Sequence, residues 1–355
     1  SGAMVIAVSF CSASGRPGGA LNRRTHAPTG PGLARGRRGY TPHVILSKPR
    51  GPLSESVGAY LTGHDDALPH DAPAHASDDG DLHLALWTMY ELSYRGFEEV
   101  DDALEWDPDL LRARREVEET FEHGLRTRIQ VPETDDVVTA LLTLLDEDDA
   151  PSLAHFVQRK ATREQVAQLL RIRSVYHFKE ADPTTWTLPR LSGRARAALV
   201  ELQYDEYGAG NPARVHQDLF VRGLEASGID TTHGPYVEDA PTEALAQNNA
   251  MTLFGLHRRL RGASLGHLAA FEATSSIPSR RMARGLERLG FAPELVEYYT
   301  EHVEADAVHE QLALREICGR LVEEEPHLAG DVLLGAAACL ELEADLARHL
   351  LEEWA

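Results

Sequence analysis

Apolar residues recur at three- and four-residue spacing from about residue 80 to the end of the chain, without a clear strand-like alternation of apolar and polar positions. That spacing places apolar side chains on one face of a helix. The pattern predicts helices over residues 80–96, 110–127, 135–147, 151–159, 163–180, 191–207, 212–227, 241–274, 279–289, 292–323 and 327–353. The predicted fold class is therefore all-α. A compact helical bundle with additional helices between residues 100 and 185 is the simplest assembly.

The start of the chain has a different composition. Residues 1–50 contain eight Lys or Arg and no Asp or Glu, and the Gly-, Pro- and Arg-rich part shows no apolar periodicity. We expect residues 1–42 to form a disordered extension, with residues 1–3 a tag remnant before Met4. Residues 43–355 are expected to form a single domain. Within it, the His- and Asp-rich residues 64–81 are expected to be a loose, solvated linker, with adventitious metal binding as the alternative.

Charge and cysteine content narrow the class of protein. The formal net charge of -21 argues against attraction to nucleic acid or to an anionic membrane. No apolar run approaches the roughly 20 residues that span a bilayer. The three cysteines show no CxxC motif or disulfide-like spacing, which fits the reducing cytoplasm. The excess of Arg over Lys suggests a bacterial genome rich in G and C.

Residues 301–311, EHVEADAVHEQ, carry the first candidate chemistry. On a helix that turns about 100° per residue, His302, Asp306 and His309 point in nearly the same direction. Imidazole and carboxylate groups on one face suit a metal such as Fe, Mn, Zn or Cu. The spacing alone leaves a second interpretation open, in which the three residues lie on a solvated face.

Two other segments could complete a ligand set. In ELQYDEYGAGNPARVHQDLF (201–220), a Gly and Pro break allows Glu206 and His216 to converge, although Asp205 could replace Glu206. In LHLALWTMYELSYRGF (82–97), Glu91 falls in an apolar and aromatic stripe. A buried carboxylate needs a cationic partner, so Glu91 is expected either to bind a metal or to form a salt bridge with an arginine.

Together these segments resemble the haem-oxygenase-like diiron oxidases and oxygenases, often called iron-containing redox enzymes. The family takes a Glu from an early helix, a Glu and a His about ten residues apart around a helix break, and a His-x3-Asp-x2-His set from a late helix. The resemblance extends loosely over residues 80–350. It assigns the metal ligands to Glu91, Glu206, His216, His302, Asp306 and His309. Ala213 stands where some relatives have a further carboxylate, which implies the version with three His and three carboxylates.

The resemblance implies a haem-oxygenase-like bundle that holds two Fe ions and uses dioxygen to oxidise a small-molecule substrate. N-oxygenation, desaturation and oxidative C–C cleavage are the reactions it includes. An external electron donor and a homodimeric assembly are both compatible with the sequence. The alternatives are the same fold with a single metal, a haem or an organic cofactor, and a helical metal- or ligand-binding protein without turnover.

Four tyrosines flank the expected ligands and could donate hydrogen bonds to them, although aromatic core packing is the favoured interpretation for each: Tyr90, Tyr94, Tyr204 and Tyr207. Asp345 and His349 also stand four apart on a helix, and we expect them to lie on a solvated face.

Overall fold

The computed structural model describes residues 44–231 and 235–355, apart from the side chains of residues 235 and 304–308. The described residues fold into helices joined by turns and contain no strand, which confirms the all-α prediction. They belong to a compact unit that spans residues 40–355. The expected disordered extension at residues 1–42 lies outside the described part of the chain.

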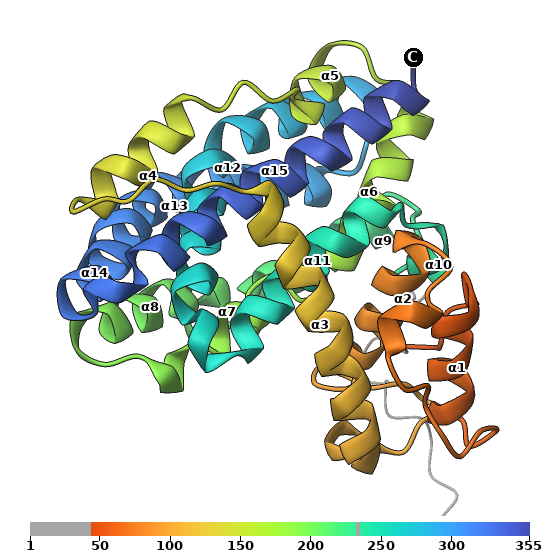
Figure 1. The fold of residues 1–355 in the computed structure, drawn as a ribbon. Helices are drawn as coiled ribbons and strands as arrows, with labels where there is room; N and C mark the ends of the chain where they lie inside the picture. The colour runs from red at the N-terminus through yellow and green to blue at the C-terminus, as the bar shows by residue number, and fades with distance from the viewer. Residues whose placement is uncertain (1–43, 232–234) are drawn as a thin grey trace, which may run out of the picture. The chain divides into compact units, whose positions relative to one another are not determined.

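The helices follow one another along the chain as shown in Figure 1. The α-helices are α1 (Pro52–Leu61), α2 (Asp79–Glu91), α3 (Pro108–Arg128), α4 (Val137–Asp146), α5 (Leu153–Arg159), α6 (Arg163–His177), α7 (Asp182–Thr185), α8 (Gly193–Glu206), α9 (His216–Ala226), α10 (Pro235–Asp239), α11 (Thr242–Leu256), α12 (Arg261–Leu289), α13 (Pro293–Gln311), α14 (Arg320–Glu324) and α15 (Ala329–Glu353). A π-helical stretch, η7 (Leu312–Gly319), joins α13 to α14. The 3₁₀ turns are η1 (Ala72–His75), η2 (Asp102–Trp106), η3 (Leu188–Arg190), η4 (Gly208–Gly210), η5 (Pro212–Arg214), η6 (Arg258–Leu260) and η8 (Pro326–Leu328).

Several predicted boundaries differ from the structure, and two of the differences concern where a long helix is interrupted. The expected helix 241–274 is interrupted at His257, whose extended backbone separates α11 from α12. Conversely, Pro278 does not end a helix, and α12 runs through it to Leu289. A proline removes one backbone hydrogen bond, but α12 packs along α13 and α15, and this contact keeps the helix continuous.

The segment 64–81 contains ordered elements. It includes η1 and the first turn of α2, and the Asp81 carboxylate is fully buried. Asp81 accepts hydrogen bonds from the backbone N–H groups of Leu53 and Ser54 at 3.1 and 2.8 Å. The first turn of α1, a helix that the apolar pattern did not predict, is therefore capped by a side chain from this segment.

Helix α12 is central to the arrangement that positions the site, and it lies beside α15 in Figure 1. The two helices approach closely at two glycines. A Cβ atom at Gly266 would overlap the carbonyl oxygen of Val332, and one at Gly335 would overlap that of Ala263. Side chains larger than hydrogen are excluded at both positions, which fixes how α12 and α15 pack.

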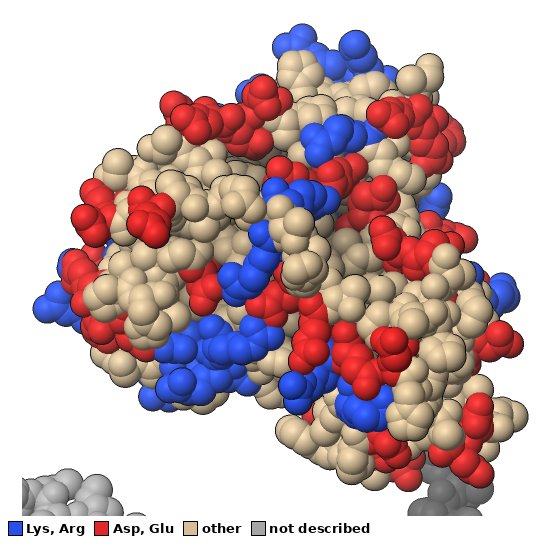
Figure 2. All heavy atoms as spheres, viewed as in Figure 1, with Lys and Arg blue, Asp and Glu red and all other residues tan. Residues whose placement is uncertain are grey.

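The molecular surface carries both signs of charge. Figure 2 shows Asp and Glu side chains in groups adjacent to Lys and Arg on the visible face. Ion pairs link acidic and basic side chains of the protein, such as Arg128 with Asp345 at 2.7 Å and Arg126 with Asp331 at 3.0 Å. Over the described residues, none of the helices combines the length and apolar character that crossing a membrane requires.

Candidate metal centre

Buried acidic and imidazole side chains converge from the ends of α6, α8 and α9, from the turn that follows α6, and from α12 and α13. They are His177, Glu180, Glu206, His216, Glu272, His302 and His309. These residues come from segments that are far apart in the sequence, so the folding of the bundle brings the group together. The arrangement has the composition of a metal centre, because imidazole nitrogen and carboxylate oxygen are the donors that iron, manganese and zinc share.

A left-handed turn brings Glu206 and His216 together. Gly208, Ala209 and Gly210 all have positive φ, of 78°, 53° and 81°. A Cβ atom at Gly208 would also overlap the backbone nitrogen of Val215, so glycine is required there. The turn directs the end of α8 back onto the start of α9. As a result, Glu206 Oε2 lies 3.0 Å from His216 Nδ1.

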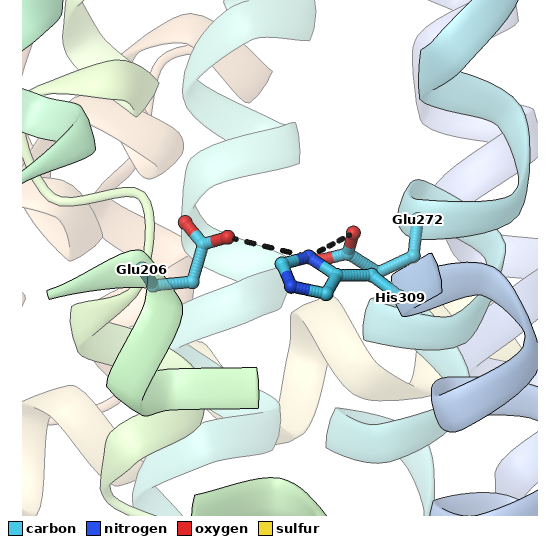
Figure 3. A group of neighbouring side chains, drawn as sticks. All are labelled: Glu206, Glu272 and His309. Atoms are coloured by element: carbon cyan, nitrogen blue, oxygen red, sulfur yellow. Dashed lines mark ion pairs between the residues drawn. The ribbon is translucent and has the colours of Figure 1, made fainter. Parts of the chain in front are cut away.

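Glu206, Glu272 and His309 form one part of the centre, shown in Figure 3. One ligand atom from each residue lies within 4.8 Å of the other two. His309 Nδ1 is 3.4 Å from Glu272 Oε2 and 3.7 Å from Glu206 Oε1. The three side chains come from α8, α12 and α13 and point toward one another, which is the geometry that a shared cation would use.

Glu180, His177 and His302 form the adjacent part, together with Tyr298. Glu180 Oε1 lies 3.2 Å from His177 Nδ1 and 3.9 Å from His302 Nε2. The Tyr298 hydroxyl is 3.0 Å from Glu180 Oε2 and 2.9 Å from His177 Nδ1. The His216 ring lies 4.6 Å from the His302 ring, so His216 connects this part to Glu206.

Burial and neighbouring charges shift the pKa values of these groups in different directions. Burial disfavours the protonated forms of His216 and His309, but the neighbouring carboxylates, led by Glu206 at the first and Glu272 at the second, together outweigh burial, and both pKa values rise to about 9. Burial dominates at His302 and lowers its pKa. Burial opposes ionisation of Glu180, yet the surrounding imidazoles lower its pKa to about 2.

The protonation of His302 can be derived from its hydrogen bond. Its Nδ1 lies 2.8 Å from the backbone carbonyl oxygen of Tyr298, which can only accept, so Nδ1 carries the proton. In the neutral ring Nε2 then has a free lone pair. That nitrogen is buried and has no hydrogen-bond partner among the described residues. A lone pair held in place in this way is what a metal ligand needs, and the residues present therefore fit a metal.

The structure places Glu91 outside this group. Its Oε2 lies 2.8 Å from Lys179 Nζ, and both side chains are fully buried. The carboxylate from the earlier part of the chain is instead Glu180, which follows Lys179 directly. We expected a metal or an arginine as the partner of Glu91. The structure corrects this expectation, because the partner is Lys179, which lies among the aromatic side chains of the stripe that contains Glu91.

The remaining expected ligands divide into two cases. Glu206, His216, His302 and His309 are brought together, whereas the side chain of Asp306 in α13 lies outside the described residues. Asp205, the alternative to Glu206, is half exposed and lies 3.4 Å from His309 Nε2, on the other side of that ring.

The four candidate tyrosines make their contacts elsewhere. Tyr94 binds Thr252 at 3.1 Å, Tyr204 donates to the carbonyl of Ala209, and Tyr207 donates to Asp182 at 2.7 Å. Tyr90 is fully buried against Arg114. A tyrosine that does hydrogen-bond within the centre is Tyr298, which the sequence interpretation missed although it stands one helical turn before His302.

Three further members were also missed, namely His177, Glu180 and Glu272. His177 and Glu180 are three residues apart, a spacing that places two side chains on one face of a helix. Glu272 is a buried acid that directly follows the apolar stretch LAAF in α12, the same kind of signal that drew attention to Glu91. These signals were present in the sequence, but nothing in it ranked Glu180 or Glu272 above Glu91.

The space beside the centre is small. A cavity of about 20 Å³ is lined by Glu180, Glu206, Glu272 and His302 on the polar side and by apolar residues, including Phe271, on the other. A volume on the order of 10–15 Å³ accommodates one water molecule. The cavity therefore holds little more than one water or one ion.

Comparison with known proteins identifies the family to which the chain belongs. The family described as iron-containing redox enzyme matches residues 167–344, which is half of the chain and includes the whole centre. A nitrosourea synthase from Streptomyces achromogenes subsp. streptozoticus is 29% identical over 165 residues, which cover 46% of this chain. The chain spans only about a third of that relative's length, since the match covers 35% of it.

Solved structures give more distant matches. A CADD-like protein of unknown function from Nostoc punctiforme PCC 73102 is 17% identical, with a TM-score of 0.49 and coverage of 66% of this chain and 98% of that chain. A domain of unknown function with a heme oxygenase-like fold from Shewanella denitrificans OS217 is 15% identical, with a TM-score of 0.43, and covers 61% of this chain and 90% of that chain.

Proposed function

We propose, since this chain belongs to the iron-containing redox enzyme family, that it is a non-haem diiron enzyme that uses dioxygen to oxidise a small molecule. The observation that supports two irons is the division of the centre into two adjacent parts. Glu180 and His302 lie in one part, and Glu206, Glu272 and His309 lie in the other. His216 contacts both, through Glu206 and through the His302 ring.

The proposed ligands are Glu180, Glu206, His216, His302 and His309, with Asp306 assigned by the family motif. When bound, the irons supply the redox chemistry with dioxygen, which no protein side chain provides. The chain supplies the donor set, its orientation and a dry environment. Glu272 adds a carboxylate beyond the motif and lies close enough to join the ligands on the His309 side.

Residues around the ligands hold them in position. The Tyr298 hydroxyl donates a hydrogen bond either to Glu180 or to His177. This contact restrains the Glu180 carboxylate. The backbone carbonyl of Tyr298 fixes the His302 tautomer. Hydrogen bonds of this kind to metal ligands orient the donor atoms and affect metal affinity by about 10- to 100-fold.

The name of the matched relative concerns a nitrosourea, so oxidation at nitrogen is one reaction that we include. Desaturation and oxidative C–C cleavage remain alongside it. We also propose a cytoplasmic enzyme that draws on an external electron donor. A helical metal-binding protein without turnover is the competing function, and its signature is iron binding without oxygen consumption.

The test is anaerobic loading with Fe(II), measurement of iron per chain, and then exposure to oxygen with an oxygen electrode. We expect two irons per chain and rapid oxygen uptake. Glu180→Ala and Glu206→Ala should each bind less iron and consume oxygen slowly, whereas Glu91→Gln should retain the iron. Two bound irons with no oxygen uptake above that of free Fe(II) would leave the metal-binding alternative. A chain that binds no iron would refute both.

A further inference from the structure

The space beside the proposed irons is too small for a substrate. Its volume of about 20 Å³ accommodates one or two water molecules, whereas small-molecule sites typically occupy several hundred Å³. If the proposed function holds, the substrate must therefore enter from a neighbouring cavity. The position of that cavity, and the groups that line it, carry information on the class of substrate.

One neighbouring cavity shares its wall with the centre. It measures about 210 Å³ and lies between α5, α6, α12 and α15. Phe271 lines both this cavity and the small space beside the ligands. His177, whose Nδ1 contacts Glu180, also lines the larger cavity. His177 and Phe271 therefore belong to the wall between this cavity and the centre.

Three larger cavities are less suitable. The cavity of about 670 Å³ lies between α2, α3, α11 and α15, the cavity of about 430 Å³ lies beside α6 and Tyr236, and the cavity of about 270 Å³ follows α2, around Tyr94 and Phe97. None of the three is lined by Phe271, by His177 or by any of the proposed ligands. Volume alone would favour them, but the substrate of a metal centre must reach the metal.

The walls of the 210 Å³ cavity are largely apolar. Leu153, Leu169, Phe271, Met282 and Tyr299 contribute hydrocarbon and aromatic surface. Such walls bind the body of an apolar ligand through the hydrophobic effect and exclude a highly hydrated one. The substrate is therefore expected to have an apolar body.

A charged group stands at one side of the same cavity. Glu343 is held by Arg173, at 2.8 Å between Oε2 and the guanidinium, and by Gln247, which donates to Oε2 at 2.6 Å. The two partners differ in access. The Glu343 side chain is 43% exposed, whereas Arg173 is 16% exposed. The accessible member is thus the acid, and its Oε1, which accepts one hydrogen bond from Arg173, retains an acceptor site.

The polar groups around Glu343 support the same sign of charge. Asp148 is a second carboxylate at this cavity, and Arg173 is its only Lys or Arg. Arg173 already donates to Glu343 and Gln247. A ligand cation would meet an exposed carboxylate, while a ligand anion would have to displace Glu343 from the arginine.

We propose that this cavity is the substrate pocket, and that the substrate carries a cationic nitrogen, an amine or a guanidine, on an apolar body. The cationic nitrogen binds Glu343, and the apolar body lies against Phe271 and Met282 toward His177. Calling the ligand a substrate rests on the proposed function. Binding of the ligand in this cavity does not require iron.

The experiment measures binding of matched probes to the full-length, metal-free protein by isothermal titration calorimetry at pH 7. The probes are 2-phenylethylamine, 2-phenylethanol and 3-phenylpropionate, which share an apolar body and differ in charge. We expect the amine to bind most tightly. Glu343→Gln should weaken amine binding at least about tenfold, the size of a lost charge-assisted hydrogen bond, and should leave the alcohol almost unchanged.

The chain offers a matched control. Arg261 and Glu325 form a similar pair, with side chains 6% and 29% exposed, away from the cavity. Glu325→Gln should leave amine binding unchanged. Met282→Trp should fill the cavity and abolish binding of the amine and the alcohol. Helical circular dichroism verifies the fold of each variant, and if Glu343→Gln does not fold, the probe series with Met282→Trp decides.

The inference is overturned if the amine does not bind at millimolar concentration, if the carboxylate binds as well as the amine, or if binding survives Met282→Trp. Iron per chain, measured separately, distinguishes the two proposals. A protein that binds iron but not the amine disproves the pocket alone. A protein that binds the amine but no iron disproves the diiron function and leaves a pocket for cationic ligands.

Discussion

Replacing Lys179 by Met should destabilise the protein strongly at neutral pH. Lys179 and Glu91 are both fully buried, and their charged atoms lie 2.8 Å apart. The lysine ammonium also stands 4.4 Å from the centre of the Tyr94 ring and 5.3 Å from that of Trp87. Methionine conserves most of the volume of lysine, so the substitution removes the charge rather than the packing.

The size of the effect follows from what happens to the carboxylate that remains. Breaking a buried ion pair by removing one partner costs about 3–5 kcal/mol. An isolated buried carboxyl takes up a proton instead, and protonating an ordinary glutamic acid at pH 7 costs about 4 kcal/mol, which limits the loss to the same range. At pH 5 this protonation costs only about 1 kcal/mol. The penalty of Lys179→Met should therefore shrink by about 3 kcal/mol between pH 7 and pH 5.

The measurement is the free energy of unfolding from urea titrations followed by circular dichroism, at both pH values. Lys48 provides a matched control, because it also pairs with a glutamate, Glu238 at 3.1 Å, but its side chain is 85% exposed. Lys48→Met should cost less than about 1 kcal/mol. The double variant Glu91→Leu with Lys179→Met removes both charges and should recover most of the lost stability.

The reasoning fails if Lys179→Met costs no more than Lys48→Met, or if its cost is the same at pH 5 and pH 7. A double variant that is as unstable as the single one would also contradict it, since no buried charge remains there. The double variant should bind iron like the wild type. Loss of iron in that variant alone would return Glu91 to the list of ligands.

Other predictions concern the centre. His309→Ala should lower iron per chain, measured after Fe(II) loading, while helical circular dichroism stays unchanged; His349→Ala, on an exposed part of α15, should change neither. Tyr298→Phe should keep the fold and weaken Fe(II) binding by about 10- to 100-fold, because Glu180 and His177 lose a shared donor. The pKa values of His216 and His309 are raised from 6.5 to about 9, so Fe(II) must displace their protons when it binds. The affinity for Fe(II) should therefore rise between pH 7 and pH 9. Binding should also release protons, which calorimetry in two buffers would measure. In the metal-free protein, the protonated forms of these two imidazoles stabilise the folded state. This stabilisation is complete below pH 6.5 and is lost as the pH rises through 9.

Sequence periodicity predicted most of the helices because an amphipathic helix records its buried face locally. It failed where the deciding interaction was distant in sequence. The helix α1 depends on a cap from Asp81, and α12 continues through Pro278 because neighbouring helices pack along it. The break at His257 has no strong breaker residue, and only the structure reveals its extended backbone.

The candidate site shows the same division. Glu206 and His216 could be paired from the sequence because the glycines between them predict a reversal of the chain. His302 and His309 share one helical face, which periodicity also records. Glu91 and Glu180 could not be ranked, because both are acids in helical surroundings, and what separates them is the direction in which Lys179 points.

The glycine contacts between α12 and α15 give the proposed pocket one immobile side. At Gly266 and Gly335 the two backbones already touch, so these helices can neither approach each other nor slide without a collision. The opposite wall is built differently, from the short helix α5 and the exposed residues before it. The closely packed wall also carries Glu272, so the same backbone contacts that shape the cavity help to hold this carboxylate in place beside His309.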